Sequence, residues 1–254
     1  MHFFMVQIKM LPCMQECVKI KGINELGGRE GMRRLTEWLK RIIPQNLWPL
    51  FIVWFVQNAA VYYVARLIIQ GRPMHDMSLP LDHQIPFIPF FIVIYLAAYF
   101  TWIAGYVIIS RGDPPRSEVI LGTLIAKLLC FAVFILYPTT MTRPDFTGGG
   151  VFGWVTRVVY FFDQSNNLFP SIHCLENYIV WRGMLGRRDI ALWIKWAFFL
   201  CMLLVFASTL FVRQHLLLDI PSAIIVGEIG LWLSRRLRLE ERFTAWLKAR
   251  RRAA

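Results

Sequence analysis

Apolar residues in this chain form long runs separated by shorter polar segments. A transmembrane helix needs about 20 predominantly apolar residues, within a range of roughly 17 to 25. Six runs approach or meet that length, and they are Leu47 to Ile69, Phe87 to Ile109, Val119 to Tyr137, Ser171 to Leu185, Ile190 to Thr209 and His215 to Leu233. This pattern predicts an all-α fold, a polytopic membrane bundle of about six transmembrane helices. The fourth run is short and starts with polar residues, as a half-buried functional helix would.

Composition supports a lipid environment. Of the 254 residues, 57% are hydrophobic and 17% are charged, which is too apolar for a soluble domain of this size. A formal charge of +12 would suit nucleic acid if the basic residues formed one face of a soluble module. They lie instead in clusters between the apolar runs. We therefore expect a lipid bilayer and no nucleic acid as partner, and the oligomeric state stays open.

The five cysteines give little support to a disulfide framework or a zinc site. Cys130, Cys174 and Cys201 lie in or beside apolar runs, and Cys13 and Cys17 are interpreted as incidental. We expect no bound metal and no cofactor.

The layout predicts three regions: an N-terminal cytoplasmic segment 1–46, a membrane domain 47–233 and a basic cytoplasmic tail 234–254. The first 31 residues lack the order of a signal peptide, so we expect the N-terminus to be retained. Met32 begins a stretch that resembles a natural start, which would make the preceding residues disordered or misannotated. The amphipathic tail is expected either to rest on an anionic inner leaflet or to set topology by its charge alone.

Basic residues indicate the orientation. With both termini in the cytoplasm, 21 of the 28 lysines and arginines lie on the inner side and four on the outer side, namely Arg72, Arg143, Arg157 and Arg213. This asymmetry favours that orientation. The connection from Pro138 to Pro170 then lies outside, and it is much longer than the median of about 4 to 6 residues for loops. We expect such a loop to carry function.

Two clusters of ionisable residues adjoin the last three apolar runs. His173 closes the sequence FPSIH, where Ser171 is placed to cap a helix N-terminus, and such termini attract anions. His215 and Asp219 are four apart, which on a helix puts them on one face. The carboxylate would hold one imidazole nitrogen and leave the other as nucleophile or base. The topology brings both histidines and Arg143 to the outer boundary, where ionisable groups are costly and tend to be functional.

These motifs resemble the type 2 phosphatidic acid phosphatase superfamily, particularly its branch of bacterial lipid phosphatases and inositol phosphorylceramide and sphingomyelin synthase relatives. The family pattern is Lys, six residues, Arg-Pro; then Pro-Ser-Gly-His; then Ser-Arg, five residues, His, three residues, Asp. The matching segments here are Arg143-Pro144, PSIH and STLFVRQHLLLD. The second and third motifs are highly specific for this superfamily, and the first is modestly so. The resemblance covers Tyr137 to Asp219 in its motifs and the six-helix layout as a whole.

The resemblance implies a membrane enzyme that hydrolyses a lipid phosphate or pyrophosphate at the extracytoplasmic face of a bacterial cell membrane, without a metal. His215 would attack phosphorus to form a phosphohistidine, with Asp219 orienting the ring. His173 would protonate the departing alkoxide and then activate water or an acceptor alcohol. Arg143, Ser171 and nearby backbone N–H groups would hold the phosphate oxygens, where charge must be stabilised during phosphoryl transfer.

Three positions depart from the family pattern. Leu136 stands where the lysine would fall, Ile172 replaces the glycine, and Thr209 replaces the second arginine. The phosphate site is therefore short of two cations. We expect Arg213, on the outer side and two residues before the nucleophile, to substitute for one of them.

Lys127 is the weaker candidate for a phosphate ligand. It lies inside an apolar run, and intramembrane charges pair with one another. We expect it to pair within the bundle with an acid such as Glu176 or Glu228.

Two further functions stay open beside the hydrolase. A phosphotransferase would pass a phospho-headgroup from a lipid donor to an alcohol, and it would share the same first half-reaction. A transporter or a degenerate structural homologue would explain the missing cations. The transporter and the degenerate homologue are both disfavoured because His173, His215 and Asp219 are all present.

Overall fold

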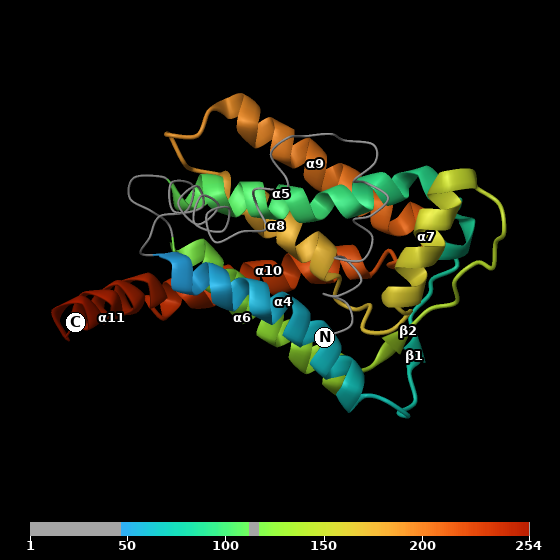
Figure 1. Ribbon diagram of the computed structural model, residues 1–254, viewed down its shortest axis with the longest axis horizontal. Helices are drawn as coiled ribbons and strands as arrows, with labels where there is room; N and C mark the ends of the chain where they lie inside the picture. The colour runs from blue at the N-terminus through green and yellow to red at the C-terminus, as the bar shows by residue number, and fades with distance from the viewer. Residues whose placement is uncertain (1–46, 112–116, 254) are drawn as a thin grey trace, which may run out of the picture. The chain divides into compact units, whose positions relative to one another are not determined.

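The computed structural model describes residues 47–111 and 117–253. Within these residues the chain is mostly helical, with eight α-helices and one pair of short strands (Figure 1). The strands, β1 (His75–Asp76) and β2 (Thr139–Thr140), pair in parallel. The segment predicted at 1–46, including the start considered at Met32 and the first two cysteines, lies outside the described residues.

Four helical segments are long and apolar enough to cross a membrane. They are α4 (Trp48–Ile68), η3 with α5 (Pro89–Phe91 and Ile92–Ser110), α6 (Ser117–Leu136) and α9 (Leu192–Phe211). Their outer faces carry large apolar side chains, such as Leu67, Phe100 and Trp193, each at least 70% exposed. Apolar surface on this scale suits lipid rather than water. These features indicate an integral membrane protein.

The other two predicted spans form helices but are not confirmed as spans. Helix α8 (Ile172–Met184) has 13 residues, about 20 Å at 1.5 Å per residue, whereas the hydrocarbon core is about 30 Å thick. Helix α10 (Asp219–Arg236) begins with a carboxylate and contains Glu228. The all-α prediction is therefore confirmed, and the structure supports four membrane-spanning helices among the described residues instead of about six.

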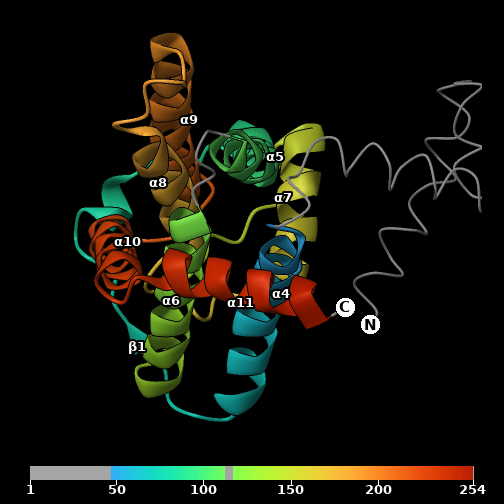
Figure 2. The same cartoon turned by 90° about the vertical axis from the view of Figure 1, so that its left-hand side faces the viewer.

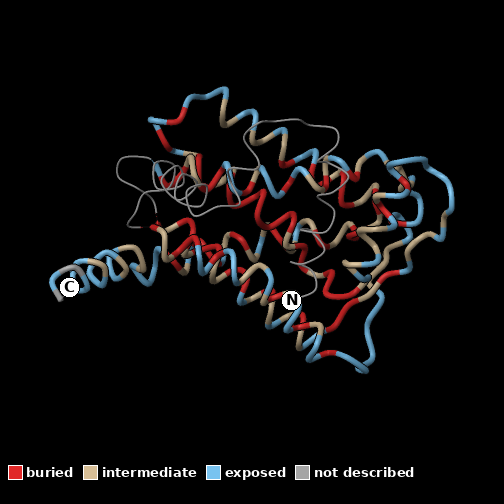
Figure 3. The backbone as a smooth tube through the Cα atoms, in the orientation of Figure 1, coloured by how far each residue is buried: buried red, intermediate tan, exposed pale blue. Residues whose placement is uncertain are grey.

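Helix α8 is the central element of the bundle. It contacts α5, α6, α9 and α10, and Figure 2 shows these helices around it. Most of its residues are buried, and they form part of the buried centre in Figure 3. Helix α5 approaches closely at Gly105, where an added Cβ would lie 2.1 Å from Val180 Cγ1. Small residues allow such backbone approach between membrane helices.

Helices α6 and α10 also meet through glycines. A Cβ on Gly230 of α10 would lie 2.5 Å from the carbonyl oxygen of Gly122 on α6. Since nothing larger than glycine fits there, the contact fixes α10 against α6. It thereby helps to set the position of Asp219 at the start of α10.

The long connection predicted at Pro138 to Pro170 contains its own helix, α7 (Gly150–Phe162). Gly149 precedes it with φ of +88°, a left-handed conformation that glycine adopts without a steric penalty. One face of α7 packs through Val155 and Val159 on a cluster that includes Tyr95. The aromatic run of this connection thus forms a helix that packs beside α5.

The basic C-terminal region is helical as well. Helix α10 continues to Arg236, and α11 (Leu239–Ala253) follows it. Glu240 Oε1 accepts hydrogen bonds from the backbone N–H and the Oγ of Ser117, both at 3.0 Å. The tail therefore caps the start of α6 in addition to carrying charge, and its binding to an anionic leaflet stays a prediction.

A buried ion pair joins the middle of the bundle. Lys127 Nζ lies 3.0 Å from Glu176 Oε1, and both side chains are fully buried. Trp54 Nε1 donates to the same carboxylate at 3.0 Å, and the Tyr106 hydroxyl donates to it too. The prediction that Lys127 pairs with an acid is confirmed, and the partner is Glu176. Glu228 pairs instead with an arginine of α8.

Candidate active site

The turn between α9 and α10 carries the predicted nucleophile. Helix α9 ends at Phe211, and Arg213 adopts φ of +50°, which reverses the chain. The backbone N–H groups of Gln214 and His215 then both donate to the Thr209 carbonyl, at 2.9 and 3.1 Å. Thr209, at the position of the second family arginine, is fully buried. Its role in the structure is to hold this turn by its backbone.

His215 and Asp219 form a pair, although not by the helical spacing that we expected. His215 lies in the turn, and α10 begins only at Asp219. The carboxylate Oδ2 reaches back over the helix start, accepting from the Leu216 N–H at 2.9 Å and lying 3.0 Å from His215 Nδ1. The helical path ends before the histidine because Arg213 adopts a positive φ.

The two groups beside His215 Nδ1 determine which ring nitrogen of His215 carries the proton. This atom lies 3.1 Å from the Leu168 carbonyl oxygen and 3.0 Å from Asp219 Oδ2. Both neighbours are acceptors, so Nδ1 carries the proton and Nε2 keeps its lone pair. An imidazole held in this way presents Nε2 as a nucleophile.

His173 faces this pair from α8. The ring centroids of His173 and His215 are 6.1 Å apart with planes inclined at 52°. Ser171 is the N-cap of α8, and its Oγ accepts from the Cys174 N–H at 3.2 Å. The predicted capping role of Ser171 is confirmed, and it fixes the first turn that carries His173. Ile172, at the position of the family glycine, is the first residue of that helix.

Three aromatic side chains of α5 enclose His173. Tyr95 stacks on its ring at a centroid distance of 4.2 Å, and Trp102 and Tyr99 lie at 5.1 and 5.4 Å. The Tyr95 hydroxyl is 3.4 Å from His173 Nδ1. Nε2 is buried and has no hydrogen-bond partner within the described chain, so it is the ring nitrogen left for a ligand.

Arg143 joins the cluster through backbone and amide groups. Its Nη1 donates to the Asp163 carbonyl at 2.6 Å, and its Nη2 donates to Gln214 Oε1. The guanidinium carbon lies 4.3 Å from the centre of the Tyr160 ring. Because Gln214 directly precedes His215, this hydrogen bond places the positive charge of Arg143 next to the turn that carries His215.

Asp163 and Tyr160 complete the surroundings of Arg143. The Asp163 carboxylate accepts a hydrogen bond from the Tyr95 hydroxyl at 3.0 Å. Asp163 therefore contacts both Arg143, through its carbonyl, and the tyrosine that stacks on His173. Tyr160 donates to the Val212 carbonyl at 2.6 Å. Burial raises the pKa of Tyr160 to about 12, although the nearby Arg143 lowers it. The phenol therefore stays neutral and serves as a donor.

Arg213 does not join the histidine cluster and contacts the connection before α5 instead. Its two terminal nitrogens donate to the carbonyl oxygens of Asp82 and Ile85, in the connection before α5. The Asp82 carboxylate in turn accepts from the Leu217 N–H and the Leu79 N–H, both at 2.8 Å. Arg213 is thus occupied as a brace between two loops. Of the two arginines predicted for phosphate, Arg143 joins the histidine cluster through Gln214 and Arg213 is turned to backbone carbonyls.

Among the described residues, no other cation predicted from the motifs stands in for the lysine of the pattern that the sequence resembles. Leu136, at that position, is 78% exposed at the end of α6. Lys127 is committed to Glu176 inside the bundle. Arg143 is therefore the predicted cation that the described structure places beside the turn carrying His215.

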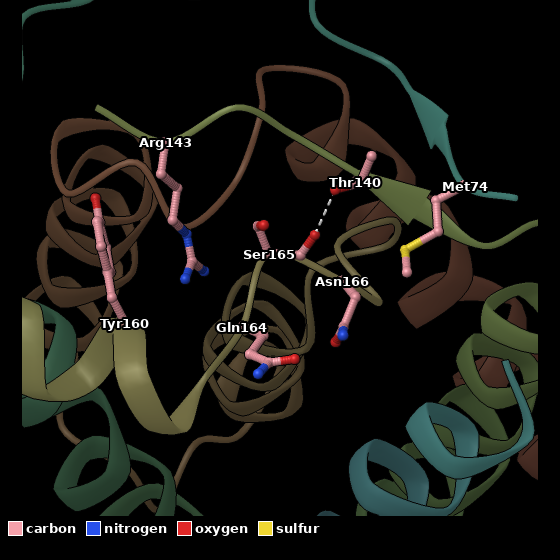
Figure 4. A pocket seen from close by; sticks show the side chains of 7 residues that line it. All are labelled: Met74, Thr140, Arg143, Tyr160, Gln164, Ser165 and Asn166. Carbon is pink, nitrogen blue, oxygen red and sulfur yellow. Dashed lines mark hydrogen bonds between the residues drawn. The ribbon is translucent and has the colours of Figure 1, made fainter. Parts of the chain in front are cut away.

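A polar pocket of about 380 Å³ opens beside Arg143. Figure 4 shows the Arg143 side chain extending into it, with Tyr160 on one side and neutral polar residues opposite. These neutral residues are Thr140, Gln164, Ser165 and Asn166. Three of them belong to the segment after α7, which runs on to Leu168 and so to His215.

Sequence reasoning missed several members of this site. Tyr95, Tyr99 and Trp102 recur at intervals of four and three, a spacing that places them on one helix face. That signal was present in the second apolar run. Asp163 and Gln214 had no comparable local signal, because their roles depend on contacts with Arg143 far away in the chain.

Comparison of the chain with protein-family models, with curated proteins and with solved structures gave no match.

Proposed function

We propose that this protein is a membrane enzyme that removes a phosphoryl group from a lipid phosphate or pyrophosphate through a phosphohistidine at His215. The observation that carries the proposal is the His215 Nδ1 to Asp219 Oδ2 contact of 3.0 Å with the second imidazole, His173, 6.1 Å away between ring centroids. A carboxylate-held imidazole facing another imidazole supplies a nucleophile and an acid–base group at one place.

The proposed reaction has two steps. His215 Nε2 attacks phosphorus and forms the P–N bond as the P–O bond to the lipid alkoxide breaks, while His173 gives the alkoxide a proton. Asp219 stabilises the positive charge on the phosphorylated imidazole. His173 then takes a proton from water, whose oxygen attacks phosphorus, and the P–N electron pair returns to His215.

Charge on the transferring group is the main electrostatic demand of this chemistry. Arg143 is the cation available next to the nucleophile turn, through its hydrogen bond to Gln214. The N-terminus of α8, capped by Ser171, adds backbone N–H groups and a favourable helix dipole. We assign Arg143 and this helix start to the phosphate oxygens, and we assign Arg213 to the support of the turn.

The lipid nature of the substrate is supported by the surrounding helices. Four helical segments are suited to a bilayer, and the aromatic enclosure of His173 belongs to one of them, α5. His173 therefore lies against a helix that suits a bilayer, which favours a lipid as the substrate. The charge asymmetry of the loops supports an extracytoplasmic position for the site.

A phosphotransferase is the second candidate, and one observation favours it. The polar pocket beside Arg143 could hold an acceptor alcohol, which would compete with water for the phosphohistidine. Both reactions use the same first step and differ in what His173 deprotonates in the second.

Purified protein in detergent micelles, assayed against a panel of lipid phosphates, tests the proposal. We expect phosphate release by the wild type and a loss of about a thousandfold or more in His215→Ala. Brief exposure to substrate labelled on phosphorus should also yield an acid-labile, base-stable protein label that His215→Ala lacks. The matched control is His83→Ala, because His83 is exposed, and it should retain both signals.

Wild-type turnover in His215→Ala would overturn the mechanism. Measuring free phosphate and new phospholipid, with and without inositol or diacylglycerol as acceptors, separates the two reactions. We expect hydrolysis to dominate, and headgroup transfer far above phosphate release would favour the transferase.

A further inference from the structure

His173 carries a positive charge twice in the proposed reaction. It begins as an imidazolium, because it gives a proton to the lipid alkoxide, and it becomes positive again when it takes a proton from water. The side chain is only 8% exposed, and a buried charge is costly unless an opposite charge or a hydrogen bond compensates it. Asp219 is already engaged, since its Oδ2 contacts His215 Nδ1 and the Leu216 N–H. Another group must therefore favour the charged form of His173.

Tyr95 of α5 is the side chain in closest ring contact with His173. The two rings stack with centroids 4.2 Å apart and planes inclined at 23°. An aromatic face attracts a cation that lies within about 6 Å of its centre. The Tyr95 hydroxyl oxygen also lies 3.4 Å from His173 Nδ1. Both the ring and the oxygen of Tyr95 are thus placed to stabilise a positive imidazole.

The direction of the Tyr95 hydroxyl proton is set by Asp163. Tyr95 donates this proton to Asp163 Oδ2 at 3.0 Å, and an ionised carboxylate only accepts. The phenol has no second proton, so its oxygen presents lone pairs to His173 Nδ1. This arrangement favours a proton on Nδ1. The negative charge of Asp163 therefore acts on His173 through a single hydroxyl group.

The other ring nitrogen of His173 is left for chemistry. Nε2 is buried and finds no hydrogen-bond partner among the described residues. With a proton held on Nδ1, Nε2 gives its proton to the alkoxide in the first step and takes one from water in the second. Nδ1 and the Tyr95 hydroxyl each keep their own proton throughout, so no proton passes across the tyrosine.

Asp163 is held in place by its backbone. It follows α7 directly, and its N–H donates to the Val159 carbonyl at 2.7 Å. Its own carbonyl accepts from Arg143 Nη1 at 2.6 Å. These two contacts leave the carboxylate to Tyr95. Neither Tyr95 nor Asp163 belongs to the motifs through which the sequence resembles a family.

We propose that Tyr95 and Asp163 are positioning residues that orient the His173 ring and stabilise its positively charged form. Each of the two imidazoles then has its own carboxylate, which for His215 is Asp219 by direct contact and for His173 is Asp163 through a hydroxyl. This inference rests on the proposed function, since it concerns the acid–base group of that reaction.

Two nearly isosteric substitutions test the pair in the purified full chain. Tyr95→Phe keeps the stacked ring and removes the hydroxyl, and Asp163→Asn keeps an accepting oxygen and removes the charge. On an alkyl phosphate we expect kcat to fall about 10- to 100-fold in Tyr95→Phe and about tenfold in Asp163→Asn, as one hydrogen bond to a charged group is lost or weakened. KM should change little, because neither residue contacts the substrate.

The leaving group separates positioning from a loss of folding. Nitrophenolate departs without needing a proton, so its release in the first turnover of a nitrophenyl phosphate should slow by less than about threefold in both variants. In a His173→Ala background, neither substitution should slow the alkyl phosphate further, because both act through His173.

A second tyrosine–carboxylate pair provides the matched control. The Tyr178 hydroxyl donates to Glu228 Oε1 at 2.6 Å, and Tyr178 lies on α8, the helix that carries His173. Tyr178→Phe and Glu228→Gln remove the same kind of hydrogen bond away from the histidines. Both should keep wild-type rates on the two substrates.

Nuclear magnetic resonance of ¹⁵N-labelled histidine gives a measurement that needs no turnover. The His173 signals are assigned by their absence in His173→Ala. We expect neutral His173 to carry its proton on Nδ1 in the wild type and to become a mixture of both tautomers in Tyr95→Phe.

The outcomes distinguish the pair from the enzyme. Equal losses on the alkyl and nitrophenyl phosphates, a further loss in the His173→Ala background, or a wild-type proton on Nε2 would overturn the pair, while phosphohistidine formation could still stand. A wild type without turnover would remove the proposed function, and a proton held on His173 Nδ1 by Tyr95 would still be observed. If Tyr95→Phe did not fold, Asp163→Asn would decide, since Asp163 is only partly buried.

Discussion

The buried ion pair between Lys127 and Glu176 gives the sharpest test of how this bundle is held together. Both side chains are fully buried, and the carboxylate also accepts from Trp54 and Tyr106. Glu176→Gln leaves an uncompensated ammonium inside the bundle. Removing one partner of a buried pair costs about 3 to 5 kcal/mol. We therefore expect the free energy of unfolding to fall by about that amount.

A second carboxylate of the bundle provides the control. Glu228 pairs with Arg182 at 2.7 Å, with side chains that are 40% and 32% exposed, and partly exposed pairs contribute about 0 to 1 kcal/mol. Glu228→Gln should therefore have a small effect. Unfolding is followed by circular dichroism as sodium dodecyl sulfate is added to detergent-solubilised protein.

The double variant Lys127→Met/Glu176→Gln completes the test. It removes both charges, so it should be less destabilised than the sum of the two single variants, with a coupling of about 1 to 3 kcal/mol. Additive losses, or a loss in Glu176→Gln no larger than in Glu228→Gln, would refute the reasoning.

Three further predictions concern the site and its orientation. His173→Ala should slow turnover of an alkyl phosphate about 10²- to 10⁴-fold and that of a nitrophenyl phosphate much less, whereas equal losses would contradict leaving-group protonation. Arg143→Lys should lower kcat/KM about tenfold or more, because lysine lacks the planar fork, and Arg213→Lys should mainly lower the melting temperature. A larger kinetic defect at Arg213 would reverse these assignments. A membrane-impermeant thiol reagent should label a cysteine placed at Gly149 in intact cells and not one at Arg187, and the opposite pattern would invert the orientation.

The sequence predicted the long helices well because apolar length is a local property. The run Val119 to Tyr137 corresponds to α6 at Ser117–Leu136, and the run Ile190 to Thr209 to α9 at Leu192–Phe211. The capping role of Ser171 was also predicted, since a cap depends on residues within one turn. The shortest run became a buried helix instead of a clear span, as its polar side chains find partners inside the bundle.

Features that depend on distant contacts escaped prediction. The direction of Arg213 is set by a positive φ and by carbonyls of residues 82 and 85, about 130 positions earlier. The histidine–aspartate spacing suggested a helix, yet a turn and a helix start produce the same pairing. Asp163 gained its role through Tyr95 and Arg143, which no short window of sequence connects.

Asp82 contacts the nucleophile turn at both of its ends, through its carbonyl at Arg213 and its carboxylate at Leu217. A single residue of the loop before α5 therefore holds both ends of the turn between α9 and α10, so this loop and this turn keep a fixed position relative to each other. Replacing the Asp82 side chain would then alter the position of His215 without touching it. Exchanging the turn alone between related chains would fail unless the loop before α5 were exchanged with it.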